Sequence, residues 1–248
     1  MRVFATYNIK GGVGKTATAV NLAYLAARGG ARTLIWDLDP QAAATFYFRV
    51  RAKVKGGAKK LLKGKRPLDA TIRGTDFEGL DILPADFTYR NMDLDLVQSK
   101  KPTRQMASLL LPLSLQYDYL FLDCAPSISL VSESIFVAAD VLLSPTIPTT
   151  LSLRTLDQLD QHLRDRGATR PRLYPFLCMV DRRKSLHKRI CASPTEHHPD
   201  MLETAIPYSS LVEQMGLRRA PLPSFAPSAE PTRAYEALWS EIVSRLSL

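Results

Sequence analysis

The sequence has few cysteines and no long apolar run. Cys124, Cys178 and Cys191 are odd in number and widely spaced, which fits neither a disulfide framework nor a metal-binding motif. We therefore expect reduced side chains in a cytoplasmic protein. No stretch reaches the roughly eighteen apolar residues of a membrane-spanning helix, so we expect no stable membrane insertion. Residues 1–7 are too short for the apolar core of a secretion signal.

Acidic residues are absent from one segment of the chain. Residues 49–66 contain nine Lys and Arg side chains and no Asp or Glu, whereas the rest of the chain holds 24 basic and 24 acidic residues. All of the formal charge of +9 can therefore be assigned to this segment. High charge, few aromatic residues and a weak hydrophobic pattern predict a mobile basic arm or insertion at about 49–76. Such a run suits DNA phosphates, an acidic protein or anionic lipid.

Apolar segments alternate with longer amphipathic ones, which is typical of βα units and a parallel sheet. We predict a single α/β domain over residues 1–248, with a mostly parallel twisted sheet flanked by helices. The predicted strands cover 2–7, 32–37, 80–84, 118–123, 140–145 and 173–180, with a further one at 203–206. The predicted helices lie near 15–29, 41–48, 103–116, 151–166, 184–192 and 229–246.

A glycine-rich loop follows the first predicted strand. Residues 8–16 are Asn-Ile-Lys-Gly-Gly-Val-Gly-Lys-Thr, and the glycines remove side chains that would block backbone N–H groups from a phosphate. Lys15 supplies a positive charge for the β- and γ-phosphates, and Thr16 supplies a hydroxyl for Mg²⁺. The helix that begins there adds its positive dipole end. The loop therefore predicts binding of a nucleoside triphosphate with magnesium, and its predicted nucleotide-binding residues are Lys10, Gly11, Gly12, Val13, Gly14, Lys15, Thr16 and Ala17.

The loop departs from the usual pattern G-x-x-x-x-G-K-[ST], which would place glycine at position 9, where this chain has Ile9 followed by Lys10. Lys-Gly-Gly-Val-Gly-Lys-Thr resembles the deviant Walker A motif of the ParA/MinD family of P-loop ATPases, also called the SIMIBI class. Asp37-Leu-Asp-Pro-Gln resembles the Walker A′ motif of that family, and Leu120-Phe-Leu-Asp-Cys-Ala-Pro-Ser resembles its Walker B motif with switch II. The resemblance is strongest to the ParA branch, which positions plasmids, chromosomes and other cargos.

The resemblance implies roles for single residues. Lys10 matches the signature lysine that reaches across a dimer to the partner's nucleotide, and Asp39 matches the carboxylate that positions or activates the attacking water. Asp37 would lie near the magnesium shell, and Asp123 would hold Mg²⁺ through water. Carboxylates at the ends of parallel strands converge above the sheet, which agrees with these roles. The implied catalytic residues are Lys10, Lys15 and Asp39, and the implied metal site is Thr16 and Asp123.

The choice of adenine follows from the resemblance alone. No guanine-binding motif of the Asn-Lys-x-Asp type is present, and the most similar segment, Cys178-Met-Val-Asp, lacks both the Asn and the Lys. In relatives the base lies after the strand that corresponds to 173–180 and near an Ile-Pro turn. We therefore predict that Met179 and Pro207 contact the base.

ParA relatives bind DNA nonspecifically as ATP-bound dimers, and a ParB-like or cargo-adaptor protein stimulates their weak basal hydrolysis. The resemblance therefore implies a homodimer on ATP binding and a cytoplasmic, nucleoid-associated protein. Contacts to DNA phosphates would make binding strongly salt-dependent. Arg182 and Arg183 also fall close to the expected nucleotide edge, which leaves a structural or phosphate role open for them. The predicted DNA-binding residues are Arg182, Arg183, Lys184, Lys188, Arg189, Arg218 and Arg219.

Other functions on the same scaffold are less well supported. A MinD-like membrane-associated ATPase needs a basic amphipathic C-terminal helix, but residues 235–248 contain Glu236 and Glu241 and little basic charge. A relative of the nitrogenase iron protein needs cluster-bridging cysteines that do not match the three here. An amide-forming synthetase should need a substrate domain for which 248 residues leave no room. A tyrosine autokinase lacks its terminal tyrosines, and Asp39 argues against a module that binds ATP without hydrolysing it.

Overall fold

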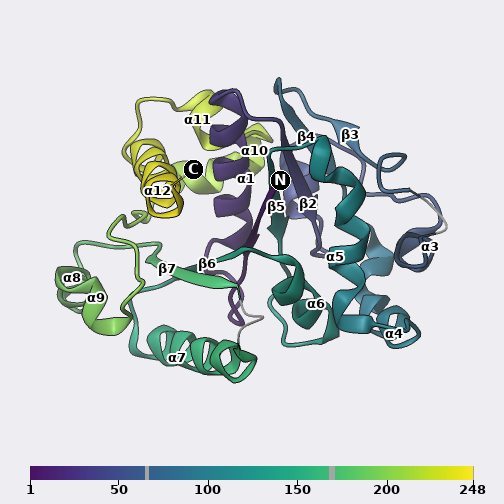
Figure 1. Cartoon of the computed structure of the whole chain (residues 1–248). Helices are drawn as coiled ribbons and strands as arrows, with labels where there is room; N and C mark the ends of the chain where they lie inside the picture. The colour runs from purple at the N-terminus through teal and green to yellow at the C-terminus, as the bar shows by residue number, and fades with distance from the viewer. Residues whose placement is uncertain (65–66, 168–170, 248) are drawn as a thin grey trace.

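A computed structural model describes residues 1–64, 67–167 and 171–247. Within these residues, one sheet of seven strands has the order β3-β4-β2-β5-β1-β6-β7 (Figure 1). Every neighbouring pair is parallel except β3 with β4. The strands are β1 Arg2–Thr6, β2 Thr33–Asp37, β3 Arg73–Gly74, β4 Leu80–Leu83, β5 Tyr119–Asp123, β6 Val141–Thr146 and β7 Arg172–Leu177.

Helices cover both faces of the sheet, which confirms the predicted fold class. Successive residues of β1 point to opposite faces, so Phe4 packs with α1 and α12, whereas Val3 and Ala5 pack with α3 to α7. No helix in the described part of the chain is both long and apolar enough to cross a bilayer. The α-helices are α1 Lys15–Arg28, α2 Ala43–Tyr47, α3 Gly57–Leu62, α4 Met92–Val97, α5 Gln105–Leu110, α6 Leu130–Ala138, α7 Thr150–Asp165, α8 Ser185–Ala192, α9 Pro194–His197, α10 Ser210–Arg218, α11 Leu222–Phe225 and α12 Glu230–Leu246, with 3₁₀ helices η1 Phe87–Asn91, η2 Pro102–Arg104 and η3 Leu111–Leu115.

The strand register brings three motifs to one edge of the sheet. Asp123 at the end of β5 is paired with Asp37 at the end of β2 and with Thr6 at the end of β1. The glycine loop leaves β1 at this same edge. Residues far apart in the sequence therefore meet where the central parallel strands end.

Two predicted elements are wrong. Residues 203–206 do not form a strand, because the backbone N–H groups of Glu203 and Thr204 donate to the carboxylate of Glu241 at 2.9 Å instead of to β7. Of the four, Ile206 donates to β7, at the carbonyl oxygen of Leu177. The helix predicted near 103–116 is divided into η2, α5 and η3. Pro112, which lies in η3, has no N–H to donate to a continuous helical ladder.

The expected mobile arm at about 49–76 is a packed part of the domain. Its apolar residues recur at helical spacing between the lysines, and that spacing was obscured by the high charge of the segment. Lys65 and Arg66, which belong to the basic run, lie outside the described residues. The side chains that anchor the segment are each 5% exposed or less: Val54, Ala58, Leu61, Leu62 and Leu68.

Candidate functional site

The glycine loop leaves the start of α1 open to an anion. Gly14 takes the N-cap position with a φ of +98°, a conformation that favours glycine, and no side chain caps the helix. A Cβ atom on Gly14 would lie 2.9 Å from Sγ of Cys178, closer than packed atoms approach. Uncapped N–H groups and the dipole of this 14-residue helix favour a negative ligand at this end.

The two lysines of the loop have different surroundings. Lys15 is 7% exposed, and its Nζ donates to the carbonyl oxygen of Lys10 at 2.9 Å. Burial lowers the pKa of Lys15, and the charge of Asp123 opposes this shift. Lys10 is exposed and donates instead to Oγ of Ser152 on α7 at 3.4 Å. The Lys15 ammonium thus closes the loop, whereas the Lys10 side chain points away from it.

The carboxylates of Asp37 and Asp123 differ in the hydrogen bonds that they accept. Asp37 accepts hydrogen bonds from the backbone N and Oγ1 of Thr45 at 2.8 and 2.7 Å, and from the backbone N of Asp39 at 3.2 Å. Burial raises the pKa of Asp37 to about 6, although these hydrogen bonds oppose the shift. Asp37 therefore holds α2 and the Walker A′ turn in place.

Asp123 is shielded from solvent, and its carboxylate makes no hydrogen bond of ordinary distance and angle to a described residue, although the Thr16 hydroxyl lies near enough to act on it. It is 0% exposed, and both of its Oδ atoms are unpaired. Burial raises the pKa of Asp123 well above its usual range, the charge of Asp37 raises it further, and the hydroxyl of Thr16 lowers it. A carboxyl group buried in this way becomes charged readily only when a cation lies beside it. The residues present therefore fit a magnesium ion, which Thr16 and Asp123 would hold.

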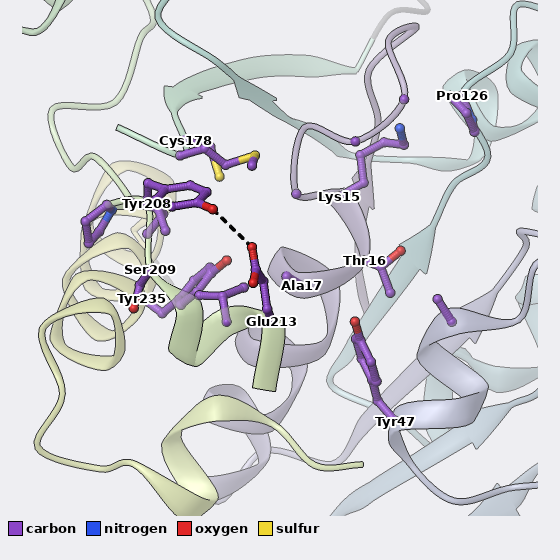
Figure 2. Close-up of a pocket in the computed structure, with 18 of the residues that line it drawn as sticks. Lys15, Thr16, Ala17, Tyr47, Pro126, Cys178, Tyr208, Ser209, Glu213 and Tyr235 are labelled. Atoms are coloured by element: carbon purple, nitrogen blue, oxygen red, sulfur yellow. Dashed lines mark hydrogen bonds between the residues drawn. The ribbon is translucent and has the colours of Figure 1, made fainter. Parts of the chain in front are cut away.

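A cavity of about 460 Å³ extends from the loop across the end of the sheet (Figure 2). The loop, Lys15 and Thr16 form one end, and Asp39 lines the wall with one Oδ held by the backbone N of Gln41 at 2.9 Å. Met179 and Pro207, predicted from the resemblance to contact the base, line the other end. Of the predicted nucleotide-binding residues, Gly11, Gly12, Gly14, Lys15, Thr16, Ala17, Met179 and Pro207 line this cavity, whereas Lys10, Val13 and Asp37 do not.

Several lining residues were not predicted from the sequence. The hydroxyl of Tyr208 donates to Oε1 of Glu213 at 3.2 Å across the far end of the cavity (Figure 2). Tyr208 lies just before α10 and Glu213 lies on it, both after the Ile-Pro turn. In the sequence, that turn is the only sign that this segment lines the nucleotide cavity. The other unpredicted lining residues are Ala43, Tyr47, Pro126, Cys178, Ile206, Ser209, Val212 and Tyr235.

The predicted DNA-binding residues fall into two groups on the fold. The first lies at α8 and comprises Arg182, Arg183, Lys184, Lys188 and Arg189, all of them exposed. Arg183 makes two contacts of 2.9 Å with the carboxylate of Asp181, so its charge is already paired.

The second group, Arg218 and Arg219, lies at the end of α10. Arg219 donates to the carbonyl oxygen of Phe46 at 3.1 Å, and its guanidinium lies 4.5 Å from the centre of the Phe46 ring. Figure 1 shows α8 and α10 apart from each other. The contacts of Arg219 with Phe46 join the end of α10 to α2.

Comparisons with known proteins agree on one family. Residues 1–170 match a family described as "AAA domain". The chain is 31% identical to the chromosome partitioning protein ParA of Caulobacter vibrioides over 254 residues, covering 99% of this chain and 95% of that protein. Its fold is similar to that of McdA from Cyanothece, solved as an aspartate-to-alanine variant in complex with ATP, with a TM-score of 0.85, 22% identity and coverage of 98% and 96% of the two chains.

A third similarity corrects an expectation about synthetases. Cobyrinic acid a,c-diamide synthase from Mycobacterium smegmatis, solved with an ATP analogue and magnesium, matches with a TM-score of 0.83 and 23% identity. The match covers 100% of this chain and 96% of that chain. The expectation that 248 residues leave no room for a synthetase is therefore wrong, because the length of that chain is comparable. The identity with ParA relatives, and not the chain length, disfavours such an enzyme.

Proposed function

The chain belongs to the ParA/MinD family of P-loop ATPases, and we propose that it is a ParA-like ATPase that positions or segregates a cargo. In this proposal ATP drives dimerisation, the dimer holds DNA nonspecifically, and a ParB-like or cargo-adaptor protein stimulates hydrolysis. The observation that carries it is the unpaired, buried carboxylate of Asp123 beside Thr16 at the open end of α1. This arrangement suits a metal-bound triphosphate.

Each residue of the site has one task in this proposal. Backbone N–H groups of the loop and the Lys15 ammonium bind the phosphates. Thr16 and Asp123 would hold Mg²⁺, which, when bound, supplies positive charge to the phosphates. Asp39, at the cavity wall, positions or deprotonates the attacking water. Met179 and Pro207 form the base end, where hydrophobic contact suits adenine.

Substitution of Gly14 tests the shape of the loop. In Gly14→Ala, a methyl group would meet Sγ of Cys178 at 2.9 Å, and the φ of +98° would be strained. We expect the affinity for Mg-ATP to fall at least about tenfold, because positive φ and close packing each cost about 1 kcal/mol or more. Titration calorimetry measures this loss. Gly30→Ala, which also has positive φ but nothing within 4 Å, is the matched control, and an equal loss there would contradict the loop-specific cause.

Lys10 supports the dimeric form of the proposal. Its side chain is exposed and does not line the cavity of its own chain. It makes a 3.4 Å contact to Oγ of Ser152, so it can move toward a second copy of the protein. A cation supplied in this way would stabilise charge on the phosphates of the opposite nucleotide. Dimer formation would then depend on ATP, because each Lys10 would bind the phosphates of the nucleotide held by the opposite chain.

DNA retention tests the proposed function most directly. A band shift with duplex DNA should show binding at least about tenfold tighter with Mg-ATP than with ADP or no nucleotide, and a steep loss with salt. The combined variant Arg182→Ala, Lys184→Ala and Lys188→Ala should weaken retention and lower the salt slope by about one per lost phosphate contact. Arg73→Ala, Arg104→Ala and Arg154→Ala together remove three other exposed cations and serve as the control. An affinity for DNA that is the same with Mg-ATP, with ADP and without nucleotide would contradict the proposal.

The MinD-like alternative is not favoured by the last helix. The apolar residues Tyr235, Leu238 and Ile242 of α12 are 1% exposed or less and pack against α1 and the sheet. A helix whose apolar face is used in the core has none left to enter a membrane surface.

A further inference from the structure

A second basic surface lies on the flank of the fold opposite α8. In α3 and the turn before it, the apolar side chains face the core and the cations face outward. Within the described part of the run, ion pairing is confined to Arg49, which contacts Asp76 at 3.3 Å. Figure 1 shows α3 at one side of the sheet and α8 at the other. The exposed cations without an ion pair to a described residue are Arg51, Lys53, Lys55, Lys59, Lys60 and Lys63.

These cations are displayed on a fixed support. The backbone N of Val54 donates to Oδ2 of Asp86 at 2.7 Å, and the backbone N of Ala58 donates to Oγ1 of Thr88 at 2.9 Å. Asp86 also accepts from the hydroxyl of Thr88 at 2.6 Å, which links the two anchors. The backbone that carries the charges is therefore ordered before any partner arrives, so binding to it costs little backbone entropy.

A hollow of about 600 Å³ continues this surface toward α4 and α5. Three lysines and a carboxylate line it together with amide and hydroxyl side chains. Gln105 bridges two of its walls, donating to the carbonyl oxygen of Leu62 at 2.6 Å and accepting from the hydroxyl of Ser99 at 2.7 Å. The lining residues are Leu62, Lys63, Asp95, Gln98, Ser99, Lys100, Lys101, Gln105 and Ser108.

Apolar side chains lie exposed on the helix that borders the hollow. Leu94 and Val97 of α4 are 69% and 68% exposed and are three residues apart, so they share one face of the helix. Asp95 and Gln98, the residues that follow them, line the hollow. Cations, hydrogen-bonding groups and an aliphatic face thus occur side by side.

The mixture of groups favours a polypeptide over the other anionic ligands. DNA phosphates would use the lysines but not the exposed aliphatic side chains of Leu94 and Val97. Two aliphatic residues beside a polar hollow form too small a face to enter a bilayer. A peptide can instead offer carboxylates to the lysines, N–H groups to Asp95, and apolar side chains to Leu94 and Val97.

We propose that the α3–α4 surface, formed by Lys59, Lys60, Lys63, Lys100, Lys101, Leu94 and Val97, binds an acidic amphipathic segment of a partner protein. Charge complementarity steers the segment to the lysines, and burial of its apolar face on α4 slows its release. The surface is separate from the nucleotide cavity, so this binding does not require the proposed ATPase function to be correct.

A synthetic peptide tests the charge requirement on the full-length protein. The probe is a labelled amphipathic helix with Glu on one face and Leu on the other, followed by fluorescence anisotropy. Lys59→Glu, Lys60→Glu and Lys63→Glu together should weaken binding at least about tenfold. Arg182→Glu, Lys184→Glu and Lys188→Glu make the same change of charge at α8 and should leave peptide binding within about twofold. A loss of equal size in both variants would overturn the proposal, because it would show a general charge effect.

A second variant set tests the apolar requirement. Leu94→Ser with Val97→Ser should weaken peptide binding about fivefold or more, whereas Leu151→Ser with Leu217→Ser, at 68% and 85% exposure, should not. A scrambled peptide of the same composition should bind more weakly, because its apolar residues no longer share a face. All four positions are exposed, so we expect the melting temperatures to stay close to that of the parent protein.

Two further probes separate the competing ligands. Duplex DNA and vesicles with an anionic lipid are titrated against the α3 triple variant and its α8 counterpart. The proposal expects DNA affinity to fall in the α8 variant and to be nearly unchanged in the α3 variant. If the α3 variant loses DNA or vesicle binding while peptide binding persists, the surface recognises phosphate and the proposal is wrong.

Discussion

Asp39→Ala should abolish turnover while leaving ATP bound. Asp39 lines the cavity beside Lys15 and Thr16, and the backbone N of Gln41 holds one of its oxygens at 2.9 Å. In the proposed function, this carboxylate orients or deprotonates the water that attacks the γ-phosphate. Loss of such a group lowers kcat by about 100-fold or more. ATP affinity should stay within about threefold, or improve, because a negative charge is removed from the phosphate end.

Phosphate release and calorimetry on the same preparation separate these two effects. Asp200→Ala, which removes an exposed carboxylate outside the cavity, controls for the change in net charge. Turnover within about tenfold of the parent protein would rule out the proposed role of Asp39. A parallel loss of ATP affinity would instead indicate that Asp39 shapes the loop.

The phosphate end of the site could be predicted from the sequence because its parts are local. The glycines, Lys15 and Thr16 are contiguous, and their order after a strand and before a helix fixes their geometry. Asp37 and Asp123 could also be predicted from the sequence, because each lies at the end of an apolar strand. Parallel pairing then brings Asp37 and Asp123 to the same edge of the sheet.

The base end could not be predicted in the same way. Tyr208 and Glu213 face the loop only because the chain after β7 returns beside that strand, where the backbone N of Ile206 donates to the carbonyl oxygen of Leu177 at 2.8 Å. No local sequence pattern encodes this arrangement. Similarly, Arg219 is one of two adjacent arginines in the sequence, and only the fold shows that it stacks on Phe46. In the basic segment, the high charge masks the helical spacing of the apolar residues, so composition alone does not indicate that the segment packs against the core. Deleting it would remove core side chains, so charge reversal is the sound test.

Asp123→Asn should lose most of the magnesium dependence of ATP binding. The two unpaired oxygens of Asp123 are the buried groups that fit a cation, and an amide is a much weaker ligand for Mg²⁺ than a carboxylate. We expect Mg²⁺ to improve ATP affinity by at least about tenfold in the parent protein and by about twofold or less in the variant. Calorimetry with Mg²⁺ and with a chelator measures both values. An unchanged magnesium effect in the variant would place the ion elsewhere.

The same substitution should make the nucleotide-free protein more stable. Burial and the charge of Asp37 raise the pKa of Asp123 above its value in the unfolded chain. The unfolded state therefore gives up this proton more readily, and the fold is destabilised once the pH exceeds the usual aspartate pKa of about 4. Asparagine carries no such charge, so at a pH of about 7.5 we expect the melting temperature to rise by about 3 °C or more. Opposite changes in stability and in magnesium-dependent binding are the signature of a buried carboxylate kept for a cation, whereas a purely structural role predicts that both decrease.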